Sequence, residues 1–110
     1  MAVSAARARE LALALPLASE APHFHLAAFR TPRKIFATLD ETLPRMNLMF
    51  DPDLRDFYME QAPEAFSPVP GGWGRNGATL CDLRLVDEAT FVSALRAAHL
   101  RAEPKPKGRR

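Results

Sequence analysis

The sequence has little of what stabilises small secreted domains or anchors a chain in a membrane. Its 110 residues include one cysteine, Cys81, and a single thiol cannot close a disulfide within the chain, so no oxidising compartment is indicated. No apolar run approaches the roughly eighteen residues that a membrane-spanning helix needs. The short apolar run after Arg7 and Arg9 is broken by Pro16, unlike a secretory signal. These absences predict a cytoplasmic protein that folds without disulfides.

A strong charge of one sign is also missing from most of the chain. The formal net charge is +2, but residues 103–110 hold four of the 15 basic residues and one of the 13 acidic ones. The first 102 residues therefore carry eleven bases and twelve acids, a net charge of −1. Prolines and a glycine interrupt the basic end, which we expect to be a disordered tail able to touch phosphates or simply to aid solubility. Residues 1–102 are predicted to form a single domain.

What is present is typical of one globular core, with 47% hydrophobic and 25% charged residues. Helical and alternating patterns succeed one another, bounded by Pro, Gly and polar breaks. They predict a helix over about residues 4–14, strands at 25–30, 34–39 and 45–50, a helix from 51 that ends before Pro63, a short extended piece at 66–69, a glycine loop at 70–77, a strand at 79–83 and a last helix from 87.

This order, α-β-β-β-α-β-β-α, shows no repeating parallel crossover. It predicts an α+β fold in two layers, an antiparallel sheet with helices packed on one face. Ile35, Ala37 and Leu39 are expected to share the buried face of one strand. Polar residues are expected to cap the three helices, at Ser4, Asp51 and Asp87.

Five segments carry a resemblance to a known family. They are LALALP (11–16), FR (29–30), KIFATL (34–39), NL (47–48) and PEAFSPVPGGWG (63–74). In this order and spacing the chain resembles the MmcQ/YjbR family of small bacterial proteins over about residues 8–102. The resemblance implies a two-layer fold with an antiparallel sheet. It also implies DNA binding, a description that rests on similarity of shape to a double-wing DNA-binding domain. Many members have a large aromatic residue where this chain has Ala78, so no stacking role is carried over to that position.

For DNA binding, the question is whether basic residues gather on one surface. Arg30, Arg33 and Lys34 bracket the first strand-to-strand turn, and Arg45 opens a later strand. We expect a basic rim of the sheet, with Trp73 able to stack on a base. The full set predicted to bind nucleic acid is Arg30, Arg33, Lys34, Arg45, Asn47, Trp73 and Arg75. The alternative is that the arginines are ordinary solvated residues and that Trp73 packs on the core.

A second functional class stays open beside DNA binding. An exposed apolar patch near Trp73, Phe24 and Met49 would make the chain an adaptor that binds a protein or small ligand. If these three residues complete the core instead, the patch does not exist. Exposure of Trp73 favours a partner, whereas convergence of the arginines favours nucleic acid.

Catalytic and metal chemistry have weak signals. Glu20, His23 and His25 lie close together in one segment, with the two histidines on alternate positions, but no fourth ligand is near in sequence, and we expect no metal site. Cys81 lies in the middle of a predicted strand, where a buried thiol is expected rather than an activated nucleophile. We therefore predict a protein that is not an enzyme and needs no cofactor.

Overall fold

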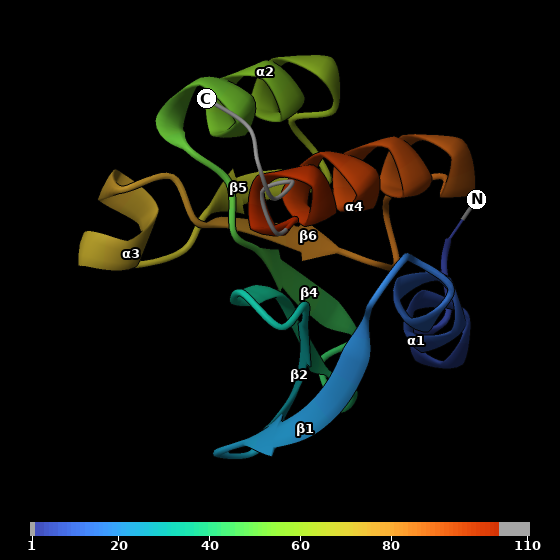
Figure 1. The fold of residues 1–110 in the computed structure, drawn as a ribbon. Helices are drawn as coiled ribbons and strands as arrows, with labels where there is room; N and C mark the ends of the chain where they lie inside the picture. The colour runs from blue at the N-terminus through green and yellow to red at the C-terminus, as the bar shows by residue number, and fades with distance from the viewer. Residues whose placement is uncertain (1, 104–110) are drawn as a thin grey trace.

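The three longest helices begin at the predicted polar caps. The computed structural model describes residues 2–103, and Figure 1 shows their arrangement. In each helix the cap side chain accepts a hydrogen bond from the backbone N–H three residues later, which satisfies one of the free donors of the first turn. These helices and cap bonds are α1 (Ala5–Leu13) with Ser4 at 3.0 Å, α2 (Pro52–Gln61) with Asp51 at 2.8 Å, and α4 (Glu88–Ala102) with Asp87 at 2.7 Å.

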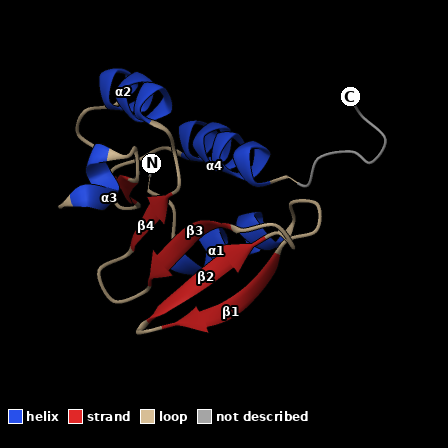
Figure 2. Cartoon of the chain, turned by 60° about the vertical axis from the view of Figure 1, so that its left-hand side comes forward, coloured by secondary structure: helices blue, strands red, loops and turns tan. Residues whose placement is uncertain are grey.

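A six-stranded sheet forms the second layer, and every neighbouring pair of strands is antiparallel. Figure 2 shows the β1–β2 hairpin at one side of the sheet, next to β3. The strand order is β1-β2-β3-β4-β6-β5. The strands are β1 (Ser19–His23), β2 (Leu26–Arg30), β3 (Ile35–Asp40), β4 (Arg45–Leu48), β5 (Phe66–Pro68) and β6 (Thr79–Asp82).

The core lies on one face of this sheet. Ala37, Met46 and Cys81, from three adjacent strands, are fully buried. The helices α1, α2 and α4 all contribute buried side chains to the same cluster, Ala12, Tyr58 and Leu95 among them. The predicted α+β fold, with an antiparallel sheet covered by helices on one face, is confirmed.

A β-bulge changes the facing of one predicted core residue. The register between β2 and β3 shifts at Phe29 and Arg30, so that Arg30 is paired with Ile35 while Phe29 is paired with Ala37. Phe36 falls at this shift and is fully buried, whereas Ile35 is only partly buried. Ala37 and Leu39 share the buried face as predicted. The prediction for Ile35 was wrong because a bulge places two successive residues of one strand opposite a single residue of its neighbour. The side chain that precedes the bulge therefore lies on the other face of the sheet.

Two elements were not predicted. β1 covers residues for which no strand was predicted, and four of its five residues are exposed. Its Ser-Glu-Ala-Pro-His sequence lacks both alternation and β-branched residues, and Pro22 fits only a strand edge that needs no donor. Within the predicted glycine loop, residues Gly72–Arg75 form one helical turn, α3. The observed order is therefore α-β-β-β-β-α-β-α-β-α.

Among residues 2–103, no helix combines the length and apolar character that crossing a bilayer would require. Apart from Glu103, the predicted basic tail lies outside the described residues.

Candidate functional site

The face of the sheet opposite the core carries a groove centred on Met49 and Trp73. It consists of three recesses that share these two residues, with volumes of about 500, 210 and 350 Å³. We call them the Arg101 recess, the aromatic recess and the basic recess, and together the Trp73 groove. The aromatic recess is lined by His23, Phe24, Leu26, Thr38, Asn47, Met49, Val69, Trp73 and Ala78. The basic recess is lined by His23, Arg30, Arg33, Lys34, Ile35, Thr38, Met49 and Trp73.

Trp73 is presented to this groove by the short helix α3, which projects from the sheet in Figure 1. Its side chain is 66% exposed, so it does not complete the core. The turn is held in place by Gly74, where a Cβ atom would lie 1.8 Å from the carbonyl oxygen of Val69. The Trp73 carbonyl in turn accepts a hydrogen bond from the N–H of Ala78 at 2.9 Å. The tryptophan is therefore exposed but sits on a fixed backbone.

Four basic residues gather at one end of the groove. We call Arg30, Arg33, Lys34 and Arg101 the basic cluster; the first three line the basic recess and Arg101 lines its neighbour. Arg33 Nη1 donates to the carbonyl of Arg101 at 2.7 Å, and Arg101 Nη1 donates to the carbonyl of Met49 at 2.5 Å. The turn after β2 is tied to the same helix end, because Thr31 Oγ1 donates to the Ala102 carbonyl at 2.5 Å. These bonds position the Arg33 and Arg101 side chains and hold the turn that carries Lys34 beside the end of α4.

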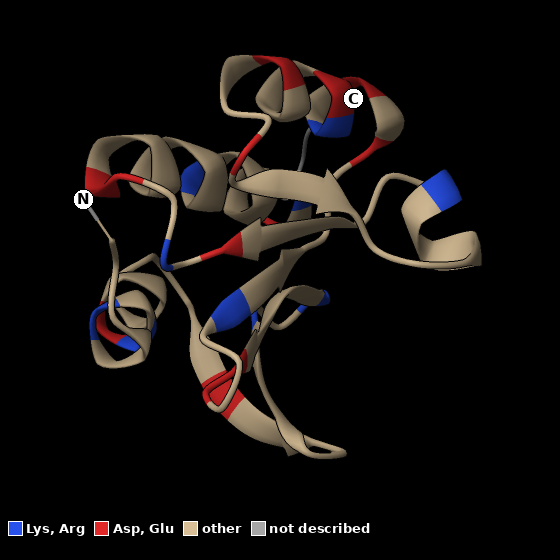
Figure 3. Cartoon of the chain, turned by 180° about the vertical axis from the view of Figure 1, so that it is seen from behind, with Lys and Arg blue, Asp and Glu red and all other residues tan. Residues whose placement is uncertain are grey.

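One member of the cluster, Arg101, forms an ion pair with an acidic residue, whereas the recess lined by the other three contains no Asp or Glu. The pKa of Lys34 is lowered, first by partial burial and then by the charges of Arg101 and Arg33. Neither Asp nor Glu occurs among the described residues that line the three recesses. Asp51, with a carboxylate oxygen 3.8 Å from Arg101 Nε, lies beside the cluster. Acidic residues gather instead on α2, as Figure 3 shows. The groove thus combines several positive charges with aromatic surface, an arrangement suited to an anion that also has flat apolar parts.

The structure brings together part of the predicted nucleic-acid set. Arg30, Arg33, Lys34 and Trp73 meet in the basic recess. Asn47 lines the aromatic recess, where its Nδ2 atom donates to Thr38 Oγ1 at 3.2 Å.

Two predicted members lie elsewhere. Arg45 is paired across the sheet with Asp40 on one side and Asp82 on the other. The pKa of Asp82 is lowered mainly by a hydrogen bond from the Arg84 side chain, with a further contribution from Arg45. Arg75 is exposed on α3 and lines none of the three recesses. Of the five predicted cations, three therefore line the basic recess, and Arg45 and Arg75 line none of the three recesses.

Arg101 was missed as a site residue. It lies in the last turn of α4, and its place in the groove depends on how that helix packs across the sheet. Phe24 and Met49, predicted as a patch with Trp73, do line one recess with it. The features expected of an adaptor and of a nucleic-acid binder consequently occupy the same groove.

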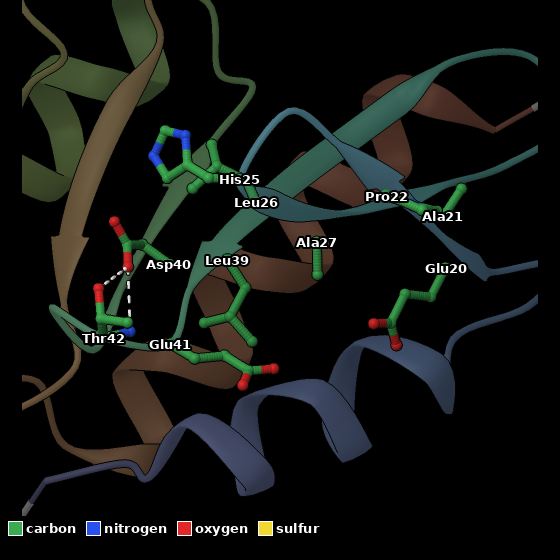
Figure 4. Close-up of a pocket in the computed structure, with 10 residues that line it drawn as sticks. All are labelled: Glu20, Ala21, Pro22, His25, Leu26, Ala27, Leu39, Asp40, Glu41 and Thr42. Atoms are coloured by element: carbon green, nitrogen blue, oxygen red, sulfur yellow. Dashed lines mark hydrogen bonds between the residues drawn. The ribbon is translucent and has the colours of Figure 1, made fainter.

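A separate hollow of about 620 Å³ lies between the β1–β2 hairpin, β3 and α1. Figure 4 shows Glu20 and Glu41 pointing toward α1 and Asp40 bonded to Thr42. Arg9 forms ion pairs with both glutamates, 3.0 Å from Glu20. The Asp40 carboxylate accepts from the Thr42 hydroxyl at 2.7 Å, the main reason its pKa is lowered. The three carboxylates that line the hollow therefore already have partners within the chain.

Metal binding and thiol catalysis also find no support in the described part of the chain. Glu20 and His25 line the hollow beside α1, whereas His23 lines the groove on the other face of the sheet. No group of three or more potential metal ligands occurs within residues 2–103. Burial raises the pKa of the Cys81 thiol to about 12, so the thiol stays protonated and is a poor nucleophile near neutral pH.

The family follows from comparison with known proteins. The model of the YjbR family matches residues 13–101. The chain belongs to the YjbR family. The fold of this YjbR protein is also similar to a crystal structure of the Deinococcus radiodurans protein DR2400, which carries the domain DUF419. The two share 19% sequence identity and a TM-score of 0.72, over 87% of this chain and 75% of the other. A search of curated proteins found no match.

Proposed function

We propose that this YjbR-family domain binds DNA through the Trp73 groove and catalyses no reaction. The observation that carries the proposal is the basic cluster, four cations at one end of a groove whose lining contains no carboxylate. Phosphate neutralisation by Lys and Arg supplies most of the affinity of weakly specific DNA binding. A cytoplasmic location, where DNA is accessible in a bacterium, is part of the same proposal.

The geometry supports this function through preorganisation. Arg33 and Arg101 are held by hydrogen bonds to backbone carbonyls, so less side-chain freedom is lost when a phosphate binds. Each guanidinium donates one N–H in these bonds and keeps other donors of its planar fork for a phosphate. Burial is the main reason that the pKa of Lys34 is lowered, and repulsion from Arg101 and Arg33 lowers it further. A polyanion relieves this repulsion. Binding is therefore expected to weaken steeply as salt is added.

The experiment is a salt series of fluorescence anisotropy with labelled DNA. Arg33→Ala and Lys34→Ala should each weaken binding by about 3- to 10-fold near 0.1 M salt and lower the slope of log K against log salt by about 0.7–0.9, the value of one lost phosphate contact. Arg33 is exposed and Lys34 is only partly buried, and neither belongs to the core, so their removal should leave the fold intact.

Arg96→Ala is the matched control, because Arg96 is exposed on α4 and lines none of the three recesses. It removes the same charge from the chain without touching the groove. Arg45→Ala is a second control, since Arg45 lies between two carboxylates. Equal losses in the control and groove variants, or unchanged slopes in all of them, would mean that the basic cluster is not the DNA site.

Exposure of Trp73 also favours a second function, the binding of a protein or small ligand by the α3 turn. The salt series separates the two. A partner held mainly by Trp73 should bind with little salt dependence and should bind the Arg33→Ala variant equally well. DNA binding should weaken both with added salt and with the Arg33→Ala substitution.

A further inference from the structure

The tip of the β1–β2 hairpin presents an aromatic residue in a conformation that is unfavourable for it. Phe24 has a φ of +59°, in a backbone region that residues other than Gly, Asn and Asp rarely occupy. Its ring is 90% exposed and meets the His23 ring edge-on at 4.8 Å between centroids. Contacts within the chain therefore offset little of the backbone strain. Residues held in this way cluster at sites of interaction, and the strain points to a role for the ring outside the chain.

Phe24 shares a recess with the other exposed aromatic residue of the sheet's open face. The aromatic recess has a volume of about 210 Å³, with Phe24 and Trp73 among its lining residues. Most of its lining is apolar. Asn47, whose amide bonds Thr38 through one N–H, keeps its carbonyl oxygen and a second N–H for a ligand. Such a recess accepts a flat heterocycle that has polar groups on its edge.

The aromatic recess continues into the basic recess, since His23, Thr38, Met49 and Trp73 line both. A ligand that fills the whole groove therefore needs flat rings at one end and negative charge at the other. In a duplex the base faces are stacked on one another and are not available to Phe24 or Trp73. In a single strand both base faces and phosphates are free, and aromatic side chains with a basic groove are the usual way to bind it.

We propose that the Trp73 groove binds single-stranded DNA, with unpaired bases stacked on Trp73 and Phe24 and the backbone phosphates on the basic cluster. This inference rests on the proposed DNA binding and narrows it to one form of the polymer. Phe24 and Trp73 supply the preference for unpaired bases. The cations bind phosphates, which single-stranded and duplex DNA both contain.

Trp73 is the only tryptophan of the chain, so its fluorescence reports on the groove directly. The probe is an oligothymidylate of about twelve nucleotides, within the usual site size of one single-strand-binding domain. It is compared with an abasic strand of the same length, which has the phosphates without the bases, and with a duplex of the same length. Oligothymidylate should quench Trp73 emission and bind at least about 10-fold more tightly than the other two.

The variants test the two rings separately. Phe24→Ala and Trp73→Ala should each weaken oligothymidylate binding by about 5- to 100-fold, the usual cost of losing one stacked base, and leave binding of the abasic strand unchanged. Phe57→Ala is the matched control, because Phe57 is 50% exposed on α2 and lines none of the groove recesses. It should bind all three probes like the unaltered chain. A circular dichroism melt shows that each variant is folded.

The outcomes separate this inference from the proposed function. Equal binding of single strand, abasic strand and duplex, with Trp73 emission unchanged, overturns the single-strand inference and leaves DNA binding standing. Tighter binding of duplex that is lost in Phe24→Ala also overturns it, because the ring then acts as a wedge between paired bases. No binding of any probe overturns both proposals together.

Discussion

Phe24 and Cys81 are two apolar side chains of the same sheet region that differ in exposure to solvent. Cys81 is fully buried at the centre of the core, and its raised pKa follows from that burial. Phe24 is a larger apolar residue, yet it is left in solvent at a hairpin tip with a positive φ. Folding alone would place glycine at such a tip, because glycine adopts a positive φ without steric cost.

Phe24→Gly is therefore expected to act in opposite directions on stability and on binding. The free energy of unfolding should rise by about 0.5–1 kcal/mol, because relief of the strained φ outweighs the greater freedom of glycine in the unfolded chain. Urea denaturation of both chains measures this change. Phe24→Ala keeps the strain while removing the ring, so it should not gain stability. A Phe24→Gly chain less stable than the original would show that the ring contributes to folding.

The short helix α3 depends on a close approach of two backbone segments. Its Gly74 lies so near the Val69 carbonyl that no side chain fits, whereas a Cβ atom at Gly72 would meet only the end of the flexible Arg75 side chain, at 3.4 Å. Two glycines that look alike in the sequence thus have different roles, and only Gly74 is required for the position of Trp73.

Gly74→Ala should lower the free energy of unfolding by about 1–3 kcal/mol, as expected for an overpacked site, and should shift Trp73 emission because α3 must move. Gly72→Ala is the control and should change stability by less than about 0.5 kcal/mol. Thermal melts followed by circular dichroism, with emission spectra of the folded chains, measure both. Equal effects at the two positions would contradict the assigned role of Gly74.

Elements with local signals were predictable and those fixed by distant contacts were not. Ser4, Asp51 and Asp87 cap helices because a short polar side chain before an apolar stripe needs no tertiary context to act. β1 has no such signal, since it exists only by pairing with β2 as an outer strand. The bulge at Phe29 and Arg30 likewise follows from register between strands, and no pattern within either strand announces it.

The same distinction holds for the site. Arg30, Arg33 and Lys34 could be grouped from the sequence because they flank one turn. Arg101 could not, because its membership depends on where the end of α4 rests, 68 residues along the chain from Arg33. Asp82 and Asp40 beside Arg45 were equally hidden, because cross-strand partners are set by the topology of the sheet.

The 110-residue chain should bind DNA more tightly than residues 1–103 alone. Residues 104–110 add four basic residues to a domain whose other cations are nearly balanced by acids. A chain truncated after Glu103 should bind more weakly, with a salt slope lower by roughly 3 if all four cations contact phosphates. Adding Arg33→Ala to the truncated chain should reduce the slope once more. Complete loss of binding on truncation would instead place the DNA site outside the groove.

The hydrogen bond from Thr31 to the Ala102 carbonyl determines where that last segment starts. It holds the end of α4 beside the turn that carries Arg33 and Lys34, so the chain leaves the domain next to the basic cluster. However they are arranged, seven further residues span at most about 25 Å. In the proposed complex, the charges of residues 104–110 would lie within that distance of the end of α4, at the high effective concentration that a short tether imposes. A bound strand that slips from one set of cations remains within reach of the other, which should lengthen its residence time.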